Sequence, residues 1–164
     1  GATVMVTGGS EEKCEFCRQL GAAEAINYRA TDWEQAFRSL RGDAGIDVVL
    51  DMVAGSYMQK NLNVLRRDGR YVMIAFLDGA RATLDMRQVV TKRLTITGST
   101  LRPQTPGEKA VIAASVEENV LPLVESGKVR PIVHATFPLH AAPAAHALME
   151  SSEHMGKIVL IPER

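Results

Sequence analysis

The sequence lacks an excess of charge of either sign. Nineteen basic side chains balance nineteen acidic ones in a chain of 164 residues, so the formal net charge is zero. Without a broad positive field, non-specific attraction to nucleic acid or to an anionic membrane is not expected, and we predict neither as a partner. Any recognition of an anion must come from a local arrangement of side chains and backbone amides.

Long apolar runs are missing as well. No stretch of about 18 consecutive apolar residues occurs, so no segment is suited to span a bilayer. The opening "GATVMVTGG" has neither the basic flank nor the cleavage signal of a secretory peptide, and we expect a cytoplasmic location. With 46% apolar and 23% charged residues, the composition is typical of a soluble globular protein with a sizeable core.

Cysteines and catalytic motifs are sparse. Cys14 and Cys17 form a single "CEFC" pair on a predicted helix, and we interpret them as two small side chains one turn apart, with redox or metal chemistry as the alternative. The four histidines lack a metal-ligand spacing such as HExxH, and neither a GxSxG elbow nor a P-loop occurs. Asp47 opens a strand, Asp85 caps a helix and Asp51 ends a strand without an obvious acid partner. We therefore predict no metal ligand and no catalytic acid or base.

What the sequence does contain is a regular alternation of strand and helix patterns over its first hundred residues. Apolar runs such as "ATVMVT", "EAINY", "IDVVLDMV", "GRYVMIAF" and "LTITGST" are separated by helical segments, two of which we expect to be capped by Ser10 and Thr31. This alternation predicts an α/β fold with right-handed βαβ units and a parallel sheet. The pattern changes after residue 103, where a long helix over 106–127 is followed by an extended segment, a helix and a closing strand.

The first strand runs into a turn, "VMVTGGSEEK", that is suited to bind an anion. Gly8 and Gly9 allow close approach of a ligand to the backbone, Ser10 offers a hydroxyl group, and Lys13 adds a point charge near the free amides of a helix start. In a dinucleotide-binding fold an acidic residue here binds the ribose diol, whereas a neutral turn beside a cation suits a 2′-phosphate. The turn therefore favours NADP(H) over NAD(H). The alternative is a tight turn with an ordinary helix cap.

Two further strand ends offer polar groups. In "NYR", Tyr28 is a candidate to lie against adenine or to donate to a phosphate, while Arg29 either adds charge or is simply solvated. In "GSTLR", which ends the last strand of the alternation, Ser99, Thr100 and Arg102 offer donors. Ligands of open α/β sheets bind at the carboxyl ends of strands, so these segments are candidate parts of one site.

In this order the segments resemble the carboxyl-terminal portion of the medium-chain dehydrogenase/reductase superfamily, specifically its zinc-free NADPH:quinone oxidoreductase (zeta-crystallin-like) branch. The likeness is carried by "GGSEEK", "LGAAEAINYR", "GIDVVLDMVAG", "LRRDGRYVMIAF", "LTITGSTLR" and "HMGKIVLIP". The resemblance implies a doubly wound, Rossmann-like parallel sheet over residues 1–103 that lacks its first βα unit and the glycine-rich pyrophosphate loop. Residues 104–164 would be the return segment of a GroES-like catalytic domain.

The resemblance also implies NADP(H) as cofactor and a set of residues that contact it. By matching position, the 2′-phosphate would lie at the turn of Gly8, Gly9, Ser10 and Lys13, with Tyr28 nearby. Val53 and Ala54 of the central strand would approach the cofactor, Ala75 and Phe76 would lie near the nicotinamide riboside, and Ser99, Thr100 and Leu101 would form the nicotinamide edge. Lys157 would close over the cofactor from the tail. Gly8 stands where acidic members of the superfamily hold the ribose diol, so its lack of charge agrees with a 2′-phosphate.

The implied reaction is hydride transfer from the nicotinamide C4 to a quinone or another conjugated electrophile such as an enone, with the cofactor supplying the reactive group. Without the pyrophosphate loop, we expect this chain alone to bind NADPH weakly and to reduce quinone negligibly. The strand "LTITG" lies where related proteins pair sheets, which predicts a homodimer through that edge. A non-catalytic Rossmann-like binding or dimerisation module, and a methyltransferase-like sheet with "VLDMVAG" as ligand strand, remain alternatives.

Overall fold

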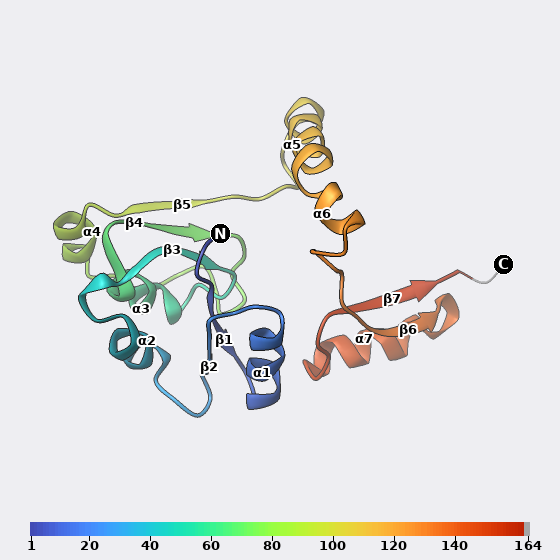
Figure 1. Cartoon of the computed structure of the whole chain (residues 1–164), viewed down its shortest axis with the longest axis horizontal. Helices are drawn as coiled ribbons and strands as arrows, with labels where there is room; N and C mark the ends of the chain where they lie inside the picture. Colours follow the sequence, from blue (N-terminus) through green and yellow to red (C-terminus); the bar gives the residue numbers. More distant parts are fainter. Residues whose placement is uncertain (163–164) are drawn as a thin grey trace. The chain divides into compact units, whose positions relative to one another are not determined.

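The computed structural model describes residues 1–162, and these divide into two compact units at the boundary between Pro103 and Gln104. Figure 1 shows the two units coloured along the chain. Every helix in the described part is too short or too polar to cross a bilayer.

The first unit alternates strands and helices as the sequence pattern predicts (Figure 1). Its elements are β1 (Met5–Gly8), α1 (Glu11–Gln19), β2 (Glu24–Asn27), α2 (Trp33–Arg41), η1 (Gly42–Ala44), β3 (Ile46–Asp51), α3 (Tyr57–Val64), β4 (Leu65–Met73), α4 (Arg87–Lys92) and β5 (Thr95–Gly98). All strand pairs are parallel, in two sheets of order β1-β2 and β3-β4-β5. The predicted α/β class with a partial, Rossmann-like arrangement of parallel strands is therefore confirmed.

Capping side chains set the starts of α1 and α2. The Ser10 side chain accepts a hydrogen bond from the Lys13 amide at 3.2 Å and caps α1, as predicted. The prediction that Thr31 caps the second helix is wrong. Asp32 is the cap, and its carboxylate accepts from the Glu34 amide at 3.1 Å. Thr31 and Asp32 are both good capping residues, and α2 begins directly after Asp32, whose carboxylate binds a free amide of the first turn.

The core of the first unit spans both sheets. One buried cluster is centred on Trp33 and Phe37 of α2. Met5 of β1 and Val49 of β3 pack against the same cluster, so the two sheets share an apolar layer. A second cluster contains Leu62, Leu65 and Tyr71, and packs α3 and α4 against β3, β4 and β5. Burying such large side chains is worth about 1.5–3 kcal/mol each, which makes these layers the main stabilising feature of the unit.

The second unit contains α5 (Pro106–Asn119), α6 (Leu121–Glu125), β6 (Val133–Pro138), η2 (Leu139–Ala141), α7 (Ala142–Ser151) and β7 (Lys157–Ile161), with β6 and β7 paired in parallel. The single long helix predicted over 106–127 is wrong, because the helix breaks between Asn119 and Leu121. Pro122 explains the break: it has no amide hydrogen, and its ring clashes with the carbonyl group four residues earlier. Proline is instead placed in the first turn of α6.

Candidate functional site

The parallel pairing of β1 and β2 brings the glycine turn next to the "NYR" segment. Gly8 ends β1 opposite Asn27, and the Tyr28 amide donates to the Gly8 carbonyl at 3.1 Å. A Cβ atom added to Gly9 would stand 2.8 Å from the Tyr28 hydroxyl oxygen and 3.7 Å from Arg29 Nε. The tyrosine and arginine side chains therefore lie against the backbone of the turn, and a side chain at position 9 would displace the Tyr28 hydroxyl group.

Gly8, the other glycine of the turn, packs closely against helix α1. A Cβ atom at Gly8 would be 2.9 Å from Cys14 Sγ, and Cys14 is fully buried. Burial raises the pKa of the Cys14 thiol, and the charge of Glu11 raises it further. Cys14 thus packs as a small apolar side chain under the turn, in agreement with the interpretation of the "CEFC" pair as structural.

The charges around the turn are mixed. Glu11 and Glu12 occupy the first turn of α1, which stabilises its amino-terminal end. Glu11 is neutralised by Arg18, whose Nη1 lies 2.9 Å from the Glu11 carboxylate. Glu12 then opposes the positive charges of Lys13 and Arg29. Arg18 also pairs with Glu15, at 3.2 Å, so the formal charges of these side chains balance. The positive charge available at the turn itself comes from Lys13 and Arg29.

Tyr57 belongs to this site, although no sequence pattern singled it out. Its ring meets the Tyr28 ring edge to face with centroids 6.3 Å apart, and lies 5.0 Å from the Trp33 ring. The Tyr57 amide donates to the Ala54 carbonyl at 2.8 Å. Burial raises the pKa of Tyr57, with a smaller contribution from Tyr28. The aromatic contact links the turn to the loop that follows β3.

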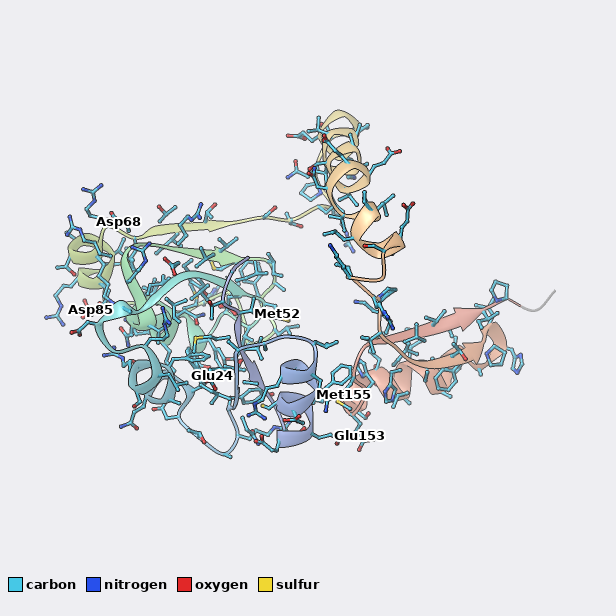
Figure 2. The ribbon with its side chains drawn as sticks, viewed as in Figure 1. Glu24, Met52, Asp68, Asp85, Glu153 and Met155 are labelled. Atoms are coloured by element: carbon cyan, nitrogen blue, oxygen red, sulfur yellow. The ribbon has the colours of Figure 1, made fainter. Side chains whose placement is uncertain are left out.

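That loop contains two of the predicted residues, and the structure treats them differently. Val53 is half-buried, whereas Ala54 is fully buried in a left-handed conformation, with φ of 57°. Both amides donate to the Asp51 carboxylate, at 2.7 Å and 3.1 Å. Met52, labelled in Figure 2, is 51% exposed beside them. The accessible apolar surface of this loop therefore comes from Met52 and Val53, and the Ala54 side chain lies inside the fold.

The segments after β4 and β5 lie at the same end of their sheet. Ala75 and Phe76 follow β4, and the next two amides donate to the loop after β3, with Leu77 to Met52 at 3.1 Å and Asp78 to Val53 at 2.8 Å. The Ser99 amide donates to the Met73 carbonyl at 3.0 Å, which holds the end of β5 beside β4. Phe76, Thr100 and Leu101 are exposed.

Lys157 lies in the second unit, where it begins β7 and its amide donates to the Ile132 carbonyl at 2.7 Å. Its proposed contact with the cofactor stays a prediction.

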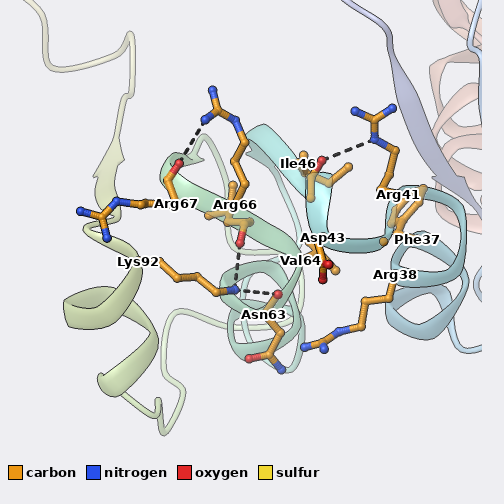
Figure 3. A pocket seen from close by; sticks show the side chains of 13 residues that line it. Phe37, Arg38, Arg41, Asp43, Ile46, Asn63, Val64, Arg66, Arg67 and Lys92 are labelled. Carbon is orange, nitrogen blue, oxygen red and sulfur yellow. Dashed lines mark hydrogen bonds between the residues drawn. The ribbon is translucent and has the colours of Figure 1, made fainter.

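A basic pocket of about 240 Å³ lies at the opposite, amino-terminal ends of β3 and β4 (Figure 3). Lys92 Nζ donates there to the carbonyl groups of Leu62, Asn63 and Leu65, and so caps the carboxyl end of α3. Burial lowers the pKa of Lys92, and the charge of Arg38 lowers it further. None of the predicted site residues lines this pocket, whose cations satisfy helix ends and neighbouring carboxylates.

Within residues 1–162 there is no group of three or more His, Cys, Asp or Glu side chains placed to hold a metal ion. The His134 and His154 rings meet edge to face, with centroids 6.4 Å apart.

Comparisons with known proteins find relatives over nearly the whole chain. A family model described as zinc-binding dehydrogenase matches residues 20–160. The 2-haloacrylate reductase of a Burkholderia species is 32% identical over 165 residues, covering 99% of this chain and 49% of that protein. The chain spans about half the length of the curated relatives it matches.

Solved structures agree with this result. The structure of Escherichia coli quinone oxidoreductase complexed with NADPH matches with a TM-score of 0.84 and 28% identity, covering 99% of this chain and 50% of that one. The structure of an NAD-dependent alcohol dehydrogenase matches with a TM-score of 0.82 and 33% identity, covering 98% of this chain and 44% of that one.

Proposed function

The chain belongs to the zinc-binding dehydrogenase family, in the quinone oxidoreductase-like branch of the medium-chain dehydrogenase/reductases, and from this premise we propose that it is part of an NADPH-dependent oxidoreductase. The parent enzyme transfers a hydride to a quinone or another conjugated carbonyl compound. The observation that carries the proposal is the glycine turn at residues 8–10, enclosed by Tyr28 and Arg29 and flanked by Lys13.

The turn supports NADP(H) as the cofactor. One structural relative is named as NAD-dependent and another was solved with NADPH, so the relatives' names leave the preference open. The residues of the turn favour the phosphorylated form. The Ser10 oxygen accepts from the Lys13 amide, which leaves the Ser10 hydroxyl hydrogen available to donate to a phosphate oxygen. Lys13 and Arg29 supply the opposing charge, and no carboxylate occupies the end of β1 to bind a ribose diol.

When bound, the nicotinamide ring supplies the hydride that is transferred. The residues of this chain orient the cofactor and exclude water around it. We assign Tyr28 to the adenosine side and the apolar surface of Val53, Ala75 and Phe76 to the nicotinamide riboside. We also assign the segment from Ser99 to Leu101 to the nicotinamide edge, and the contact of Lys157 with the cofactor stays a prediction. No residue of the chain is assigned as a catalytic acid or base, since protons on the product can come from solvent.

Open sheet edges support the proposal that the fold is completed by a further strand. Within the described residues, β1 pairs only with β2, and β3 pairs with β4 but with no strand on its other side. Met5 of β1 and Val49 of β3 nevertheless pack on one apolar cluster. On β3, Val48 is 45% and Leu50 65% exposed, which is unusual for a strand of a two-sided parallel sheet. A parallel strand between β1 and β3 would join the two sheets, and its following turn would hold the diphosphate.

The family name refers to zinc, but the residues described here do not fit a zinc site. No group of three suitable ligands occurs in residues 1–162, so we assign no metal to this part of the protein and derive no step through one.

Stopped-flow absorbance of NADPH mixed with a simple quinone tests the proposal. We expect the 164-residue chain to oxidise NADPH negligibly, and a longer parent polypeptide that contains the pyrophosphate loop to turn over. Robust turnover by the 164-residue chain would contradict the proposal that the site needs a further strand and loop.

A second candidate function, a dimerisation module, is favoured by the free edge of β5, which among the described strands pairs only with β4. An exposed strand edge is a template for pairing with a second copy. Sedimentation velocity over a range of concentrations tests it: we expect a monomer–dimer equilibrium, and a strict monomer at the highest concentration would exclude pairing through this edge.

A further inference from the structure

Asp51 is a buried carboxylate at the end of the central strand β3, and only 4% of it is exposed. Its Oδ1 accepts from the Val53 amide at 2.7 Å. Its Oδ2 accepts from the Ala54 amide at 3.1 Å, from Asn61 Nδ2 at 2.9 Å and from the Tyr71 hydroxyl at 2.5 Å. Four donors from three elements thus converge on one side chain, which compensates for removing the carboxylate from water.

The pairing of the strands creates this convergence. Val49 of β3 pairs with Tyr71 of β4, and since side chains alternate along a strand, Asp51 lies on the same face as Val49. Asn61 reaches the carboxylate from α3, which covers that face. Burial and the hydrogen bond to Asp51 raise the pKa of Tyr71, so its phenol remains a neutral donor at every physiological pH.

The loop after Asp51 has a conformation that needs support. Ala54 and Gly55 both have positive φ, at 57° and 46°. A Cβ atom at Gly55 would lie only 2.1 Å from the Asp78 carbonyl oxygen, so glycine is required there. At Ala54 an ordinary side chain adopts the left-handed region, which is normally unfavourable. The bond from the Ala54 amide to Asp51 helps to hold it there.

The backbone polar groups of Val53 and Ala54 form hydrogen bonds within the protein. The amides of Val53 and Ala54 donate to Asp51, while their carbonyl groups accept from Asp78 and Tyr57, both at 2.8 Å. Both amide hydrogens are therefore already bound within the protein and do not point to a ligand.

We propose that Asp51 is a positioning residue that turns the Val53 and Ala54 amides of the β3–α3 loop inward, so that this part of the loop meets the cofactor with apolar side chains, chiefly Val53. The inference rests on the proposed function for the identity of the cofactor. It specifies how the loop contributes to the site: by shape and contact, with the amides held away from the ligand. Tyr71 and Asn61 hold the same carboxylate from β4 and α3.

Amide hydrogen exchange of the ¹⁵N-labelled 164-residue chain tests the positioning role without any ligand. In Asp51→Asn one acceptor oxygen is replaced by a donor that faces the Ala54 amide or its neighbours. We expect exchange of the Val53 and Ala54 amides to accelerate about tenfold or more, the factor equivalent to about 1.4 kcal/mol, with β4 amides within about twofold of wild type. Tyr71→Phe is the matched control, because it removes one donor to Asp51 and leaves both loop bonds in place. We expect it to keep the Val53 and Ala54 amides protected.

An NADPH titration of samples labelled with ¹³C as well as ¹⁵N tests how the loop meets the cofactor. NADPH should shift the Val53 methyl signals of the wild-type chain, and Asp51→Asn should reduce that response while the signals of residues 8–13 still move. If Asp51→Asn does not fold, Asp51→Glu supplies the readout, since it keeps a carboxylate but displaces it by one methylene; we expect faster exchange at Val53 and Ala54 there too.

The outcomes separate the two proposals. Uniformly faster exchange throughout the first unit in Asp51→Asn, or unchanged protection of the two loop amides, would overturn the positioning role. Shifts at residues 8–13 with no response at Val53 would also overturn it, and would leave the proposed cofactor intact. If NADPH moves no signal of the wild-type chain, the proposed cofactor site fails, and the positioning role toward NADPH fails with it, whatever the exchange data show.

Discussion

The rings of Tyr28 and Tyr57 meet edge to face, with their planes at 83°. Tyr28 follows β2 and stands over Gly9 of the turn, whereas Tyr57 opens α3 directly after the loop that ends β3. Two parts of the proposed cofactor site that are distant in sequence are thereby coupled through one aromatic contact. Such contacts are worth about 0.5–1.5 kcal/mol beyond the area they bury.

Replacing Tyr57 with alanine should therefore lower the free energy of unfolding by about 2–3 kcal/mol, because the contacts with Tyr28 and Trp33 are lost together and a cavity remains. Tyr57→Phe keeps the ring and should cost less than about 1 kcal/mol. Urea unfolding followed by Trp33 fluorescence measures both. Equal losses for the two variants would show that the ring contacts do not stabilise the fold.

Gly9→Ala tests the close packing of the turn. The added methyl group would stand 2.8 Å from the Tyr28 hydroxyl oxygen, so the tyrosine has to move away. We expect the affinity for adenosine 2′-phosphate to fall about fivefold, the equivalent of about 1 kcal/mol. Gly107→Ala is the matched control, because nothing lies within 4 Å of a Cβ atom there, and it should leave affinity unchanged. Unaltered binding by Gly9→Ala would remove Tyr28 from the site.

Lys13→Glu tests the source of the cofactor preference. A charge-assisted contact with the 2′-phosphate is worth about 1.5–3 kcal/mol before screening by solvent, so the ratio of NADPH to NADH affinity should fall about tenfold or more. Lys128→Glu makes the same change of charge at an exposed position of the second unit and should leave the ratio unchanged. Fluorescence titration with the two nucleotides gives both ratios. An unchanged ratio in Lys13→Glu would mean that the phosphate assignment is wrong.

Asp78 gives the fold a dependence on acid. The Asp78 carboxylate accepts from the Ser56 hydroxyl at 2.6 Å and from the Ser56 amide at 2.9 Å, and these bonds hold the pKa of Asp78 below its ordinary value. A lowered pKa in the folded state means that this stabilisation is present above the unfolded pKa, near 3.8, and is lost as the pH falls through the folded pKa. Thermal unfolding measured over about five pH units, from neutral to acid pH, checks this. The unfolding temperature should fall less on acidification in Asp78→Asn and in Ser56→Ala than in wild type. Parallel curves would contradict the assignment.

The two cysteines should differ in reactivity. Cys14 is fully buried and burial raises the pKa of its thiol, whereas Cys17 is half-buried. Since the thiolate is the reactive form, we expect iodoacetamide to modify Cys17 about tenfold faster or more, with Cys14 labelled only on unfolding. Peptide mapping by mass spectrometry measures the two rates. Equal rates would show that the packing of Cys14 under the turn is open to solvent.

Features that depend on local chemistry could be predicted from the sequence. The alternating strands and helices follow from apolar runs and caps, and Ser10 caps α1 because a hydroxyl group precedes an acidic first turn. The predicted helix bounds are wrong where two capping residues compete or where one proline interrupts a long helical pattern. Thr31 and Asp32 are both good caps, and Pro122 divides a segment that otherwise has continuous helix-forming residues.

Features that depend on strand pairing could not be predicted. The four donors to Asp51 meet only because β3 pairs with β4 and α3 covers that face, and no short segment contains this information. For the same reason Tyr57 was missed, and the burial of Ala54 was not foreseen. The residues of the turn and Tyr28 could be found, because β1 and β2 are neighbours in sequence and their ends meet directly.

We propose that residues 8–13 with Tyr28 and Arg29 bind the 2′-phosphate of NADPH. Titrating the ¹⁵N-labelled chain with adenosine 2′-phosphate and, separately, with adenosine 5′-phosphate tests it most directly, since neither ligand needs a pyrophosphate loop. We expect adenosine 2′-phosphate to bind about tenfold tighter or more and to shift the amide signals of Gly9, Ser10, Lys13 and Tyr28. Equal affinities for the two nucleotides, or shifts confined to other parts of the chain, would contradict it.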